Sequence, residues 1–187
     1  MKSAVLVIDM VRDFTDMEQG KVPNIGAGKI VPIIADFVER ARQFGAVIIW
    51  VIDSHRPGKP DWELENVRAH CEGGTLGVEL APPLSPQPED YVITKRRYSA
   101  FVGTDLDLIL RDNNIECIFL SGTKTNVCIR ATATDAFERN YRVIVPRECV
   151  ETDKQHLHDA NLEDIDKYMG RHKCRICFRT LNLGSTH

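Results

Sequence analysis

The sequence predicts one three-layer α/β/α domain over residues 1–187, built on a mainly parallel sheet of six strands. Short apolar runs of strand length alternate along the chain with segments of helical periodicity. This alternation is typical of parallel strands whose two faces are covered by helices. A chain of 187 residues with 43% hydrophobic residues suits a single core. No internal repeat, low-complexity tract or linker divides it.

The first quarter of the chain predicts two strands joined by a helix. Residues 4–9 form a short apolar run, as expected for a strand buried on both faces. Residues 29–44 carry apolar side chains at helical spacing, with Pro32 in the first turn and Gly45 as a C-cap. Residues 46–53 form a second apolar run, so we expect a second buried strand there.

The rest of the chain repeats this pattern with shorter segments. Thr104 is a plausible N-cap for one helix, and alanines favour another. Proline-containing loops are expected at residues 56–60 and 82–88. The further strands are expected at residues 91–94, 117–121, 142–145 and 175–178. The further helices are expected at residues 104–113, 126–140 and 156–169.

Composition and charge argue against a nucleic-acid-binding, membrane or secreted protein. The net charge of −3 gives no basic surface of the kind that binds nucleic acid. No apolar run approaches the roughly 20 residues that a membrane helix needs. The first apolar run stops at Asp9, which makes it too short for a signal peptide. We therefore expect a cytoplasmic protein that acts on a small molecule, without nucleic acid or membrane partners.

Six cysteines are scattered along the chain. Without a secretory signal, free thiols are the better interpretation. Cys174 and Cys177 form a single CxxC pair, which is a weak zinc signal because a structural site usually needs a second pair of ligands. We interpret these two as buried thiols of a late strand.

Chemically active side chains follow four of the predicted strands. Asp9 closes the first strand, Asp53 and His55 lie at the end of the second, Lys95 follows the third, and Cys128 begins the helix after the fourth. Ligands of open parallel sheets bind beyond the carboxyl ends of the strands. Each residue alone has an ordinary structural interpretation, but their convergence on one edge favours a functional site.

This set of residues suits nucleophilic catalysis. A thiol near a helix N-terminus or a cation is more easily ionised, and Lys95 supplies a cation for Cys128. Asp9 is placed to take the thiol proton as a general base and to return it to the leaving group. Backbone N–H groups of the turn before Cys128 are candidates for holding an oxyanion.

Three motifs resemble those of the isochorismatase-like cysteine hydrolases, over roughly residues 5–150. They are LVIDMVRDF at residues 6–14, KRRYSAF at residues 95–101 and SGTKTNVCIRATATDAFERNYRVIV at residues 121–145. The last is the most specific. The resemblance implies the Rossmann-like fold of that family and a catalytic triad of Asp9, Lys95 and Cys128. It also implies a cis peptide between Thr123 and Lys124, an oxyanion bound by the N–H groups of Lys124 and Cys128, and a homodimer or homotetramer.

A second cluster resembles the metal region of nicotinamidases within this family. It consists of Asp53, His55 and His70. Two imidazoles and a carboxylate suit zinc, iron or manganese with water at open positions. We expect a divalent metal, zinc first, and no organic cofactor. The alternative is that both histidines only form hydrogen bonds in the wall of the pocket.

The expected reaction is hydrolysis of a C–N bond in a small amide or ureido compound through a thioester. The short spacing between Lys95 and Tyr98 resembles carbamoylsarcosine amidases, and nicotinamidases usually have a longer one. We therefore favour an N-carbamoylsarcosine amidase-like enzyme, with a nicotinamidase as the alternative. A non-catalytic metabolite-binding protein and a thiol sensor are further alternatives, but neither requires an intact triad.

Four residues are candidates for binding the substrate. Lys124 and Arg97 are cations that suit a substrate carboxylate, which a carbamoyl acid carries and nicotinamide lacks. Phe14 and Trp62 are aromatic side chains that suit stacking on a flat substrate. The alternatives are exposed charges for the cations and core packing for the rings.

Overall fold

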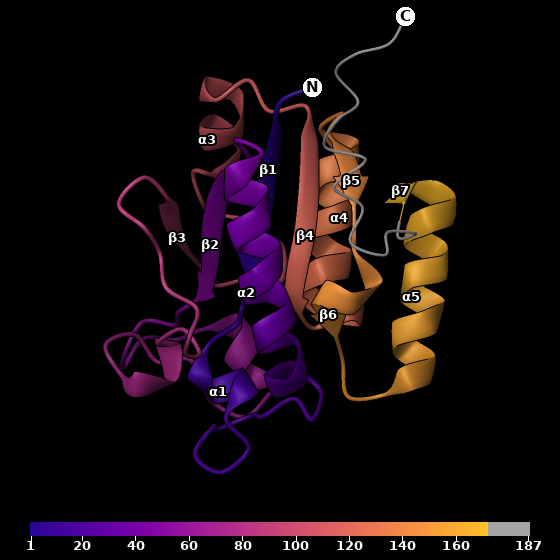
Figure 1. Cartoon of the computed structure of the whole chain (residues 1–187). Coiled ribbons are helices and arrows are strands. Elements are labelled where there is room, and N and C mark those ends of the chain that lie inside the picture. The colour runs from indigo at the N-terminus through magenta and orange to yellow at the C-terminus, as the bar shows by residue number, and fades with distance from the viewer. Residues whose placement is uncertain (172–187) are drawn as a thin grey trace, which may run out of the picture.

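A computed structural model describes residues 1–171, with a sheet of parallel strands running through the middle of the molecule (Figure 1). The strand order is β3-β2-β1-β4-β5-β7, and β6 pairs with the end of β4. Every pairing is parallel. The strands are β1 (Ser3–Ile8), β2 (Val47–Asp53), β3 (Tyr91–Lys95), β4 (Cys117–Thr123), β5 (Arg142–Ile144), β6 (Val150–Glu151) and β7 (Gly170–Arg171).

The predicted fold class is confirmed, with two differences among the short strands of the second half of the chain. The sixth place in the main strand path belongs to the two-residue β7. The strand predicted at residues 175–178 lies outside the described residues, as do Cys174 and Cys177. The short β6 was not predicted.

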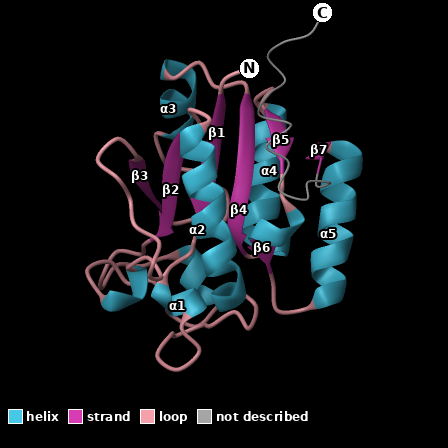
Figure 2. Ribbon diagram, viewed as in Figure 1, coloured by secondary structure: helices cyan, strands magenta, loops and turns pink. Residues whose placement is uncertain are grey.

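Helices lie on both faces of the sheet (Figure 2). They are α1 (Arg12–Thr15), α2 (Ala27–Gln43), α3 (Leu106–Asp112), α4 (Arg130–Glu138) and α5 (Gln155–Tyr168). Shorter turns are the 3₁₀ turns η1 (Trp62–Glu65), η2 (Leu76–Val78) and η4 (Arg147–Cys149), and the π-helical turn η3 (Thr125–Ile129). No helix within residues 1–171 is both long and apolar enough to cross a bilayer.

The core has two halves because side chains alternate across each strand. On β1, Val5 and Val7 pack in one cluster with Ile34 and Phe37 of α2. Its remaining apolar residues pack on the other face, in a cluster with α3, α4 and α5. A strand buried on both faces is apolar along most of its length, which is why the N-terminal apolar run predicts a strand.

The ends of the predicted helices differ from the observed ones by one or two residues, except that α4 begins at Arg130, four residues after its predicted start, because the π-helical turn η3 precedes it. The helix α2 begins at Ala27, so Pro32 lies in its second turn rather than its first. Gly45 follows that helix with a φ of +74°, as a C-terminal glycine should. The N-cap of α3 is Asp105 and not Thr104, although the Thr104 hydroxyl accepts a hydrogen bond from the Leu106 N–H at 3.3 Å.

The strand order reverses between β1 and β4, since β2 and β3 lie on one side and β5 and β7 on the other. In open parallel sheets, ligands bind at such a switch point. The two strands approach closely there. A Cβ on Gly122, whose φ is +115°, would lie 1.9 Å from the carbonyl oxygen of Ile8.

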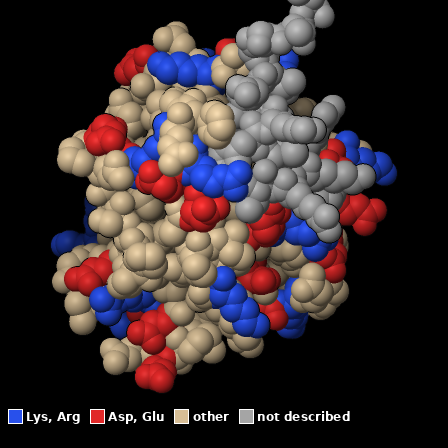
Figure 3. Space-filling view, in the orientation of Figure 1, with Lys and Arg blue, Asp and Glu red and all other residues tan. Residues whose placement is uncertain are grey.

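Acidic and basic side chains are interspersed on the face seen in Figure 3, without a large basic patch.

Candidate active site

Asp9, Lys95 and Cys128 come together in a buried cluster beyond the carboxyl ends of the strands. Lys95 Nζ lies 2.8 Å from Asp9 Oδ2 and 3.6 Å from Cys128 Sγ. The side chains of Asp9 and Lys95 are 1% exposed or less, which makes the lysine an internal cation rather than part of a solvated basic run. Three strands that are far apart in the sequence therefore deliver an acid, a cation and a thiol to one point.

The backbone turns sharply after β1. Asp9 has a φ of +57°, in the left-handed region that non-glycine residues rarely occupy. Its N–H still donates to the carbonyl of Val51 at 2.9 Å, so it remains tied to β2. Backbone outliers of this kind concentrate at functional sites, where the surrounding structure holds them in place.

The three groups shift one another's protonation. Burial raises the pKa of Asp9 to about 6, against the opposing effect of Lys95. Burial alone would lower the pKa of Lys95, but Asp9, Cys128 and Asp53 together raise it well above its usual value. Burial also raises the pKa of Cys128, despite the nearby ammonium. At neutral pH the site therefore holds a carboxylate, an ammonium and a neutral thiol.

The protonation state of Cys128 corrects one expectation. The helix N-terminus and Lys95 were expected to favour a thiolate, but desolvation has the larger effect and keeps the sulfur protonated at rest. The thiol consequently needs a base at the moment of attack, and Asp9 is the carboxylate within reach.

The turn before Cys128 is held by buried polar side chains that sequence reasoning did not identify. The peptide between Thr123 and Lys124 is cis. The Asn24 side-chain amide donates to the Thr123 hydroxyl, and the Thr125 hydroxyl lies 3.0 Å from His158 Nδ1. These contacts join sequence-distant segments to the end of β4 and to η3, so no local sequence pattern predicts them.

A second cluster lies beside the first. Asp53, His55, Glu63 and His70 are all buried, and each offers a ligand atom within 4.8 Å of the others. Asp53 Oδ2 lies 3.4 Å from His55 Nε2 and 3.3 Å from His70 Nε2. Glu63 was missed because it lies in the short 3₁₀ turn η1, within a loop that has no periodic pattern. Lys95 Nζ is 3.9 Å from Asp53 Oδ1, so the two clusters are neighbours.

The residues of this second cluster fit a divalent cation. Among the described residues, His55 Nε2 and Asp53 Oδ1 are buried without a hydrogen-bond partner. Unpaired buried polar atoms are costly, and a metal ion would satisfy them. Two imidazoles and two carboxylates form a donor set that suits zinc. His70 Nδ1 lies 2.7 Å from the carbonyl of Arg68, which leaves its Nε2 to face the cluster.

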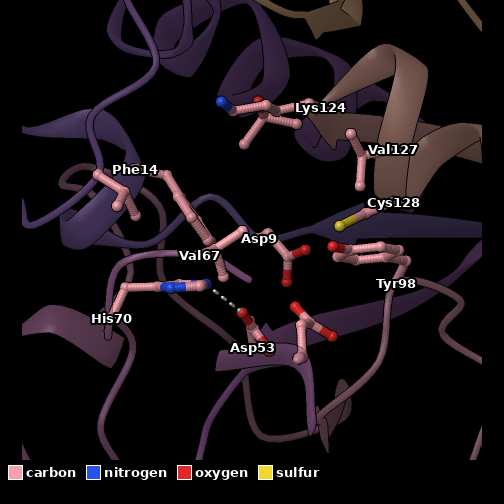
Figure 4. Close-up of a pocket in the computed structure, with 12 residues that line it drawn as sticks. Asp9, Phe14, Asp53, Val67, His70, Tyr98, Lys124, Val127 and Cys128 are labelled. Carbon is pink, nitrogen blue, oxygen red and sulfur yellow. Dashed lines mark ion pairs between the residues drawn. The ribbon is translucent and has the colours of Figure 1, made fainter. Parts of the chain in front are cut away.

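Both clusters open on one cavity of about 190 Å³. Figure 4 shows Cys128, Asp9 and Asp53 around it, with Tyr98 on one side and Phe14 and His70 on the other. The lining residues are Asp9, Phe14, Val22, Asp53, Glu63, Val67, His70, Tyr98, Thr123, Lys124, Val127 and Cys128. The cavity thus joins a nucleophile to a group of metal-binding side chains through a mostly apolar wall.

Two of the four predicted substrate-binding residues line this cavity. Phe14 and Lys124 do so, but the Lys124 amine points away from Cys128 and pairs with Asp153 Oδ2 at 2.5 Å (Figure 4). Trp62 is 70% exposed and is not among the lining residues. Arg97 also lies outside the lining, and its guanidinium pairs with Asp61 at 2.8 Å. The cations proposed for a substrate carboxylate are therefore engaged elsewhere.

Comparisons with known proteins show which family the chain resembles in sequence and in fold. The sequence profile of the Isochorismatase domain matches residues 3–172. A probable inactive nicotinamidase of Arabidopsis thaliana is 37% identical over 173 residues, which are 87% of this chain and 87% of that protein. The crystal structure of N-carbamoylsarcosine amidase from Thermoplasma acidophilum is 35% identical, with a TM-score of 0.81 over 92% of this chain and 95% of that one.

The crystal structure of the pyrazinamidase of Pyrococcus horikoshii in complex with zinc is 28% identical to the chain. Its TM-score is 0.83, over 92% of this chain and 98% of that one. The residues matched by the profile include those of both clusters, and these three relatives cover 87–92% of the chain. On this evidence the chain belongs to the isochorismatase family.

Proposed function

We propose that the chain is a cysteine amidohydrolase that cleaves the C–N bond of a small neutral amide through a thioester on Cys128. The observation that carries this proposal is the buried contact of Lys95 with both Asp9 and Cys128 at the edge of the cavity. A nucleophile and a base that both contact one buried cation are the parts that covalent hydrolysis needs.

Asp9 takes the proton of Cys128 as the sulfur attacks the carbonyl carbon of the substrate. The backbone N–H groups of Lys124 and Cys128 stabilise the developing oxyanion. Asp9 then gives the proton to the leaving nitrogen, and ammonia or an amine departs. Asp9 next deprotonates a water molecule that hydrolyses the thioester and restores the thiol. Lys95 holds the Asp9 carboxylate in place and balances its charge throughout.

Asp53, His55, Glu63 and His70 are the residues that would hold a divalent metal, with zinc as the first candidate. A bound metal would supply a Lewis acid that anchors a polar atom of the substrate beside Cys128. The zinc complex of the Pyrococcus horikoshii pyrazinamidase supports this assignment.

The charges around the cavity support a neutral substrate. Asp9, Asp53 and Glu63 line it, whereas its basic lining residues are His70, which faces Asp53, and Lys124, which pairs with Asp153. Among the described residues that line the cavity, a substrate carboxylate would lack a free cation, which argues against the ureido acid that the sequence favoured. An N-carbamoyl acid remains the second candidate, because the Thermoplasma acidophilum amidase is 35% identical.

The proposal includes catalytic turnover by this chain, although the relative from Arabidopsis thaliana is named a probable inactive nicotinamidase. This chain has Asp9, Lys95 and Cys128 in contact, which supports catalysis over binding alone.

Ammonia release by the zinc-loaded protein tests the proposal. The panel contains nicotinamide and simple amides as neutral compounds, and N-carbamoylsarcosine and other ureido acids as anionic ones. We expect release from a neutral amide that Cys128→Ala abolishes. Cys117→Ala is the matched control, because Cys117 is a buried thiol at the amino end of the central strand β4, at the opposite end of that strand from Cys128.

Release from ureido acids alone would select the second candidate. Binding of a panel compound without any release would contradict the hydrolase and favour a binding protein.

A further inference from the structure

We infer that Asp61 is a positioning residue for two of the four candidate metal ligands, and that Arg97 holds Asp61 in place. This inference rests on the metal site given under the proposed function. Neither residue lines the cavity, so both act through the ligands and not on the substrate.

The carboxylate of Asp61 contacts two candidate metal ligands, His55 and Glu63, at the same time. Its Oδ2 lies 2.9 Å from His55 Nδ1, and its Oδ1 accepts a hydrogen bond from the Glu63 N–H at 3.2 Å. The second bond makes Asp61 the N-cap of η1, the turn that carries Glu63. The Asp61 side chain is 7% exposed, so water offers it little competition for these partners.

The contact with His55 decides which ring nitrogen faces the cluster. A carboxylate at Nδ1 fixes a proton there and leaves the Nε2 lone pair free for a metal. His55 Nε2 is one of the buried atoms that lack a hydrogen-bond partner among residues 1–171, and it lies 3.4 Å from Asp53 Oδ2. Asp61 therefore orients the ring and sets its tautomer in a single contact.

Arg97 connects this carboxylate to the strand that carries Lys95. Its guanidinium donates to Asp61 Oδ1 at 2.8 Å and also to the carbonyl of Arg96. The Arg97 side chain is 43% exposed. With His55 Nδ1 and the Glu63 N–H, its guanidinium is the third donor around the Asp61 carboxylate, and its charge strengthens the contact. Arg97, which the sequence suggested for substrate binding, thus supports the candidate metal cluster.

Zinc affinity tests the inference, measured by competition with a chromophoric chelator on metal-free protein. The variants are Asp61→Ala, Asp61→Ser and Arg97→Ala. Serine keeps the ability to cap η1 but is too short to reach His55, so it separates the two roles of Asp61. The controls are Asp107→Ala and Arg96→Ala. Asp107 also accepts from an arginine and a ring hydroxyl, but it lies on α3 at the other end of the sheet (Figure 1).

We expect Asp61→Ala to weaken zinc binding by about 10–100-fold, the usual cost of losing a carboxylate behind a metal-binding histidine. Asp61→Ser should recover only part of that loss, and Arg97→Ala should lose several-fold. Both controls should match the parent protein. Far-UV circular dichroism and thermal unfolding of the metal-free variants verify that the fold persists. Because the Arg97 side chain is partly exposed, Arg97→Ala tests the inference without disturbing the core.

Zinc binding by Asp61→Ala at the parent affinity would overturn the inference. Parent affinity in Asp61→Ser would overturn the role assigned to the His55 contact. Failure of the unsubstituted protein to bind zinc would overturn the metal site and this inference together. Ammonia release from the substrate, compared between the parent protein and Cys128→Ala, would still test the hydrolase separately.

Discussion

At the scale of single residues, the site is governed by burial. Asp9, Lys95 and Cys128 are removed from water, and a buried charge is tolerated only when it is paired. Lys95 pairs with Asp9 at 2.8 Å, and the neutral thiol of Cys128 avoids a second buried anion. The same arrangement leaves Asp9 as a carboxylate whose basicity is above that of an ordinary aspartate, which suits a general base.

The raised pKa of Asp9 predicts an acid limb in the pH profile. Burial raises this pKa from 3.8 to about 6, and the reaction needs the carboxylate form. The value of kcat/KM should therefore increase as pH rises through about 6 and then level off. Asp9→Asn should lower kcat by about 10²–10⁴-fold, the range for loss of a general base. A flat profile between pH 5 and 7 would contradict the role of Asp9.

Removal of the buried cation should be costly for the fold. Lys95→Met leaves Asp9 and Asp53 without their shared counter-ion, and breaking a buried pair typically costs about 3–5 kcal/mol in the free energy of unfolding. Urea denaturation at pH 7.5 measures this loss, which should shrink at pH 5 because Asp9 then binds a proton. Arg111→Ala is the control, since its exposed pair with Asp107 contributes about 0–1 kcal/mol. An equal effect of both variants would count against an internal ion pair.

At the scale of elements, the strands that carry the site were predictable and the loops that complete it were not. Continuous apolar runs mark β1 and β2 because both faces of these strands are buried, and the residues at their ends then follow. The two-residue strands β6 and β7 are too short to leave such a pattern. Glu63 and Asp61 lie in an irregular loop, where position depends on contacts with Arg97 and His55.

The glycine at the end of β4 is a sharp test of how closely the two central strands approach. A Cβ at Gly122 would lie 1.9 Å from the Ile8 carbonyl oxygen, whereas a Cβ at Gly45 meets nothing within 4 Å. Both have positive φ angles, so Gly45→Ala measures the backbone cost alone, about 1–2 kcal/mol. Gly122→Ala should cost more in urea denaturation and should reduce ammonia release, because Asp9 follows Ile8 directly. Equal costs would contradict the close approach.

At the scale of the whole molecule, the switch point between β1 and β4 brings two kinds of chemistry into one cavity. The thiol comes from the turn after β4, the base from the residue after β1, and the candidate metal ligands from the last residue of β2 and the segment that follows it. The sequence predicted this convergence from strand ends alone. It could not predict that Lys124 and Arg97 are paired with aspartates, because those pairings join separate loops.

The metal cluster predicts that zinc stabilises the folded protein. Asp53, His55, Glu63 and His70 come together only in the native structure, so a metal that binds them favours the folded state over the unfolded one. Zinc at 100 times its dissociation constant should add about 2.7 kcal/mol to the free energy of unfolding. Chelation should remove this gain, and thermal unfolding with and without zinc measures it. The double variant His55→Ala with His70→Ala should unfold at the same temperature in both conditions and should carry no zinc by elemental analysis. A zinc-dependent rise that survives in this variant would place the metal elsewhere in the chain.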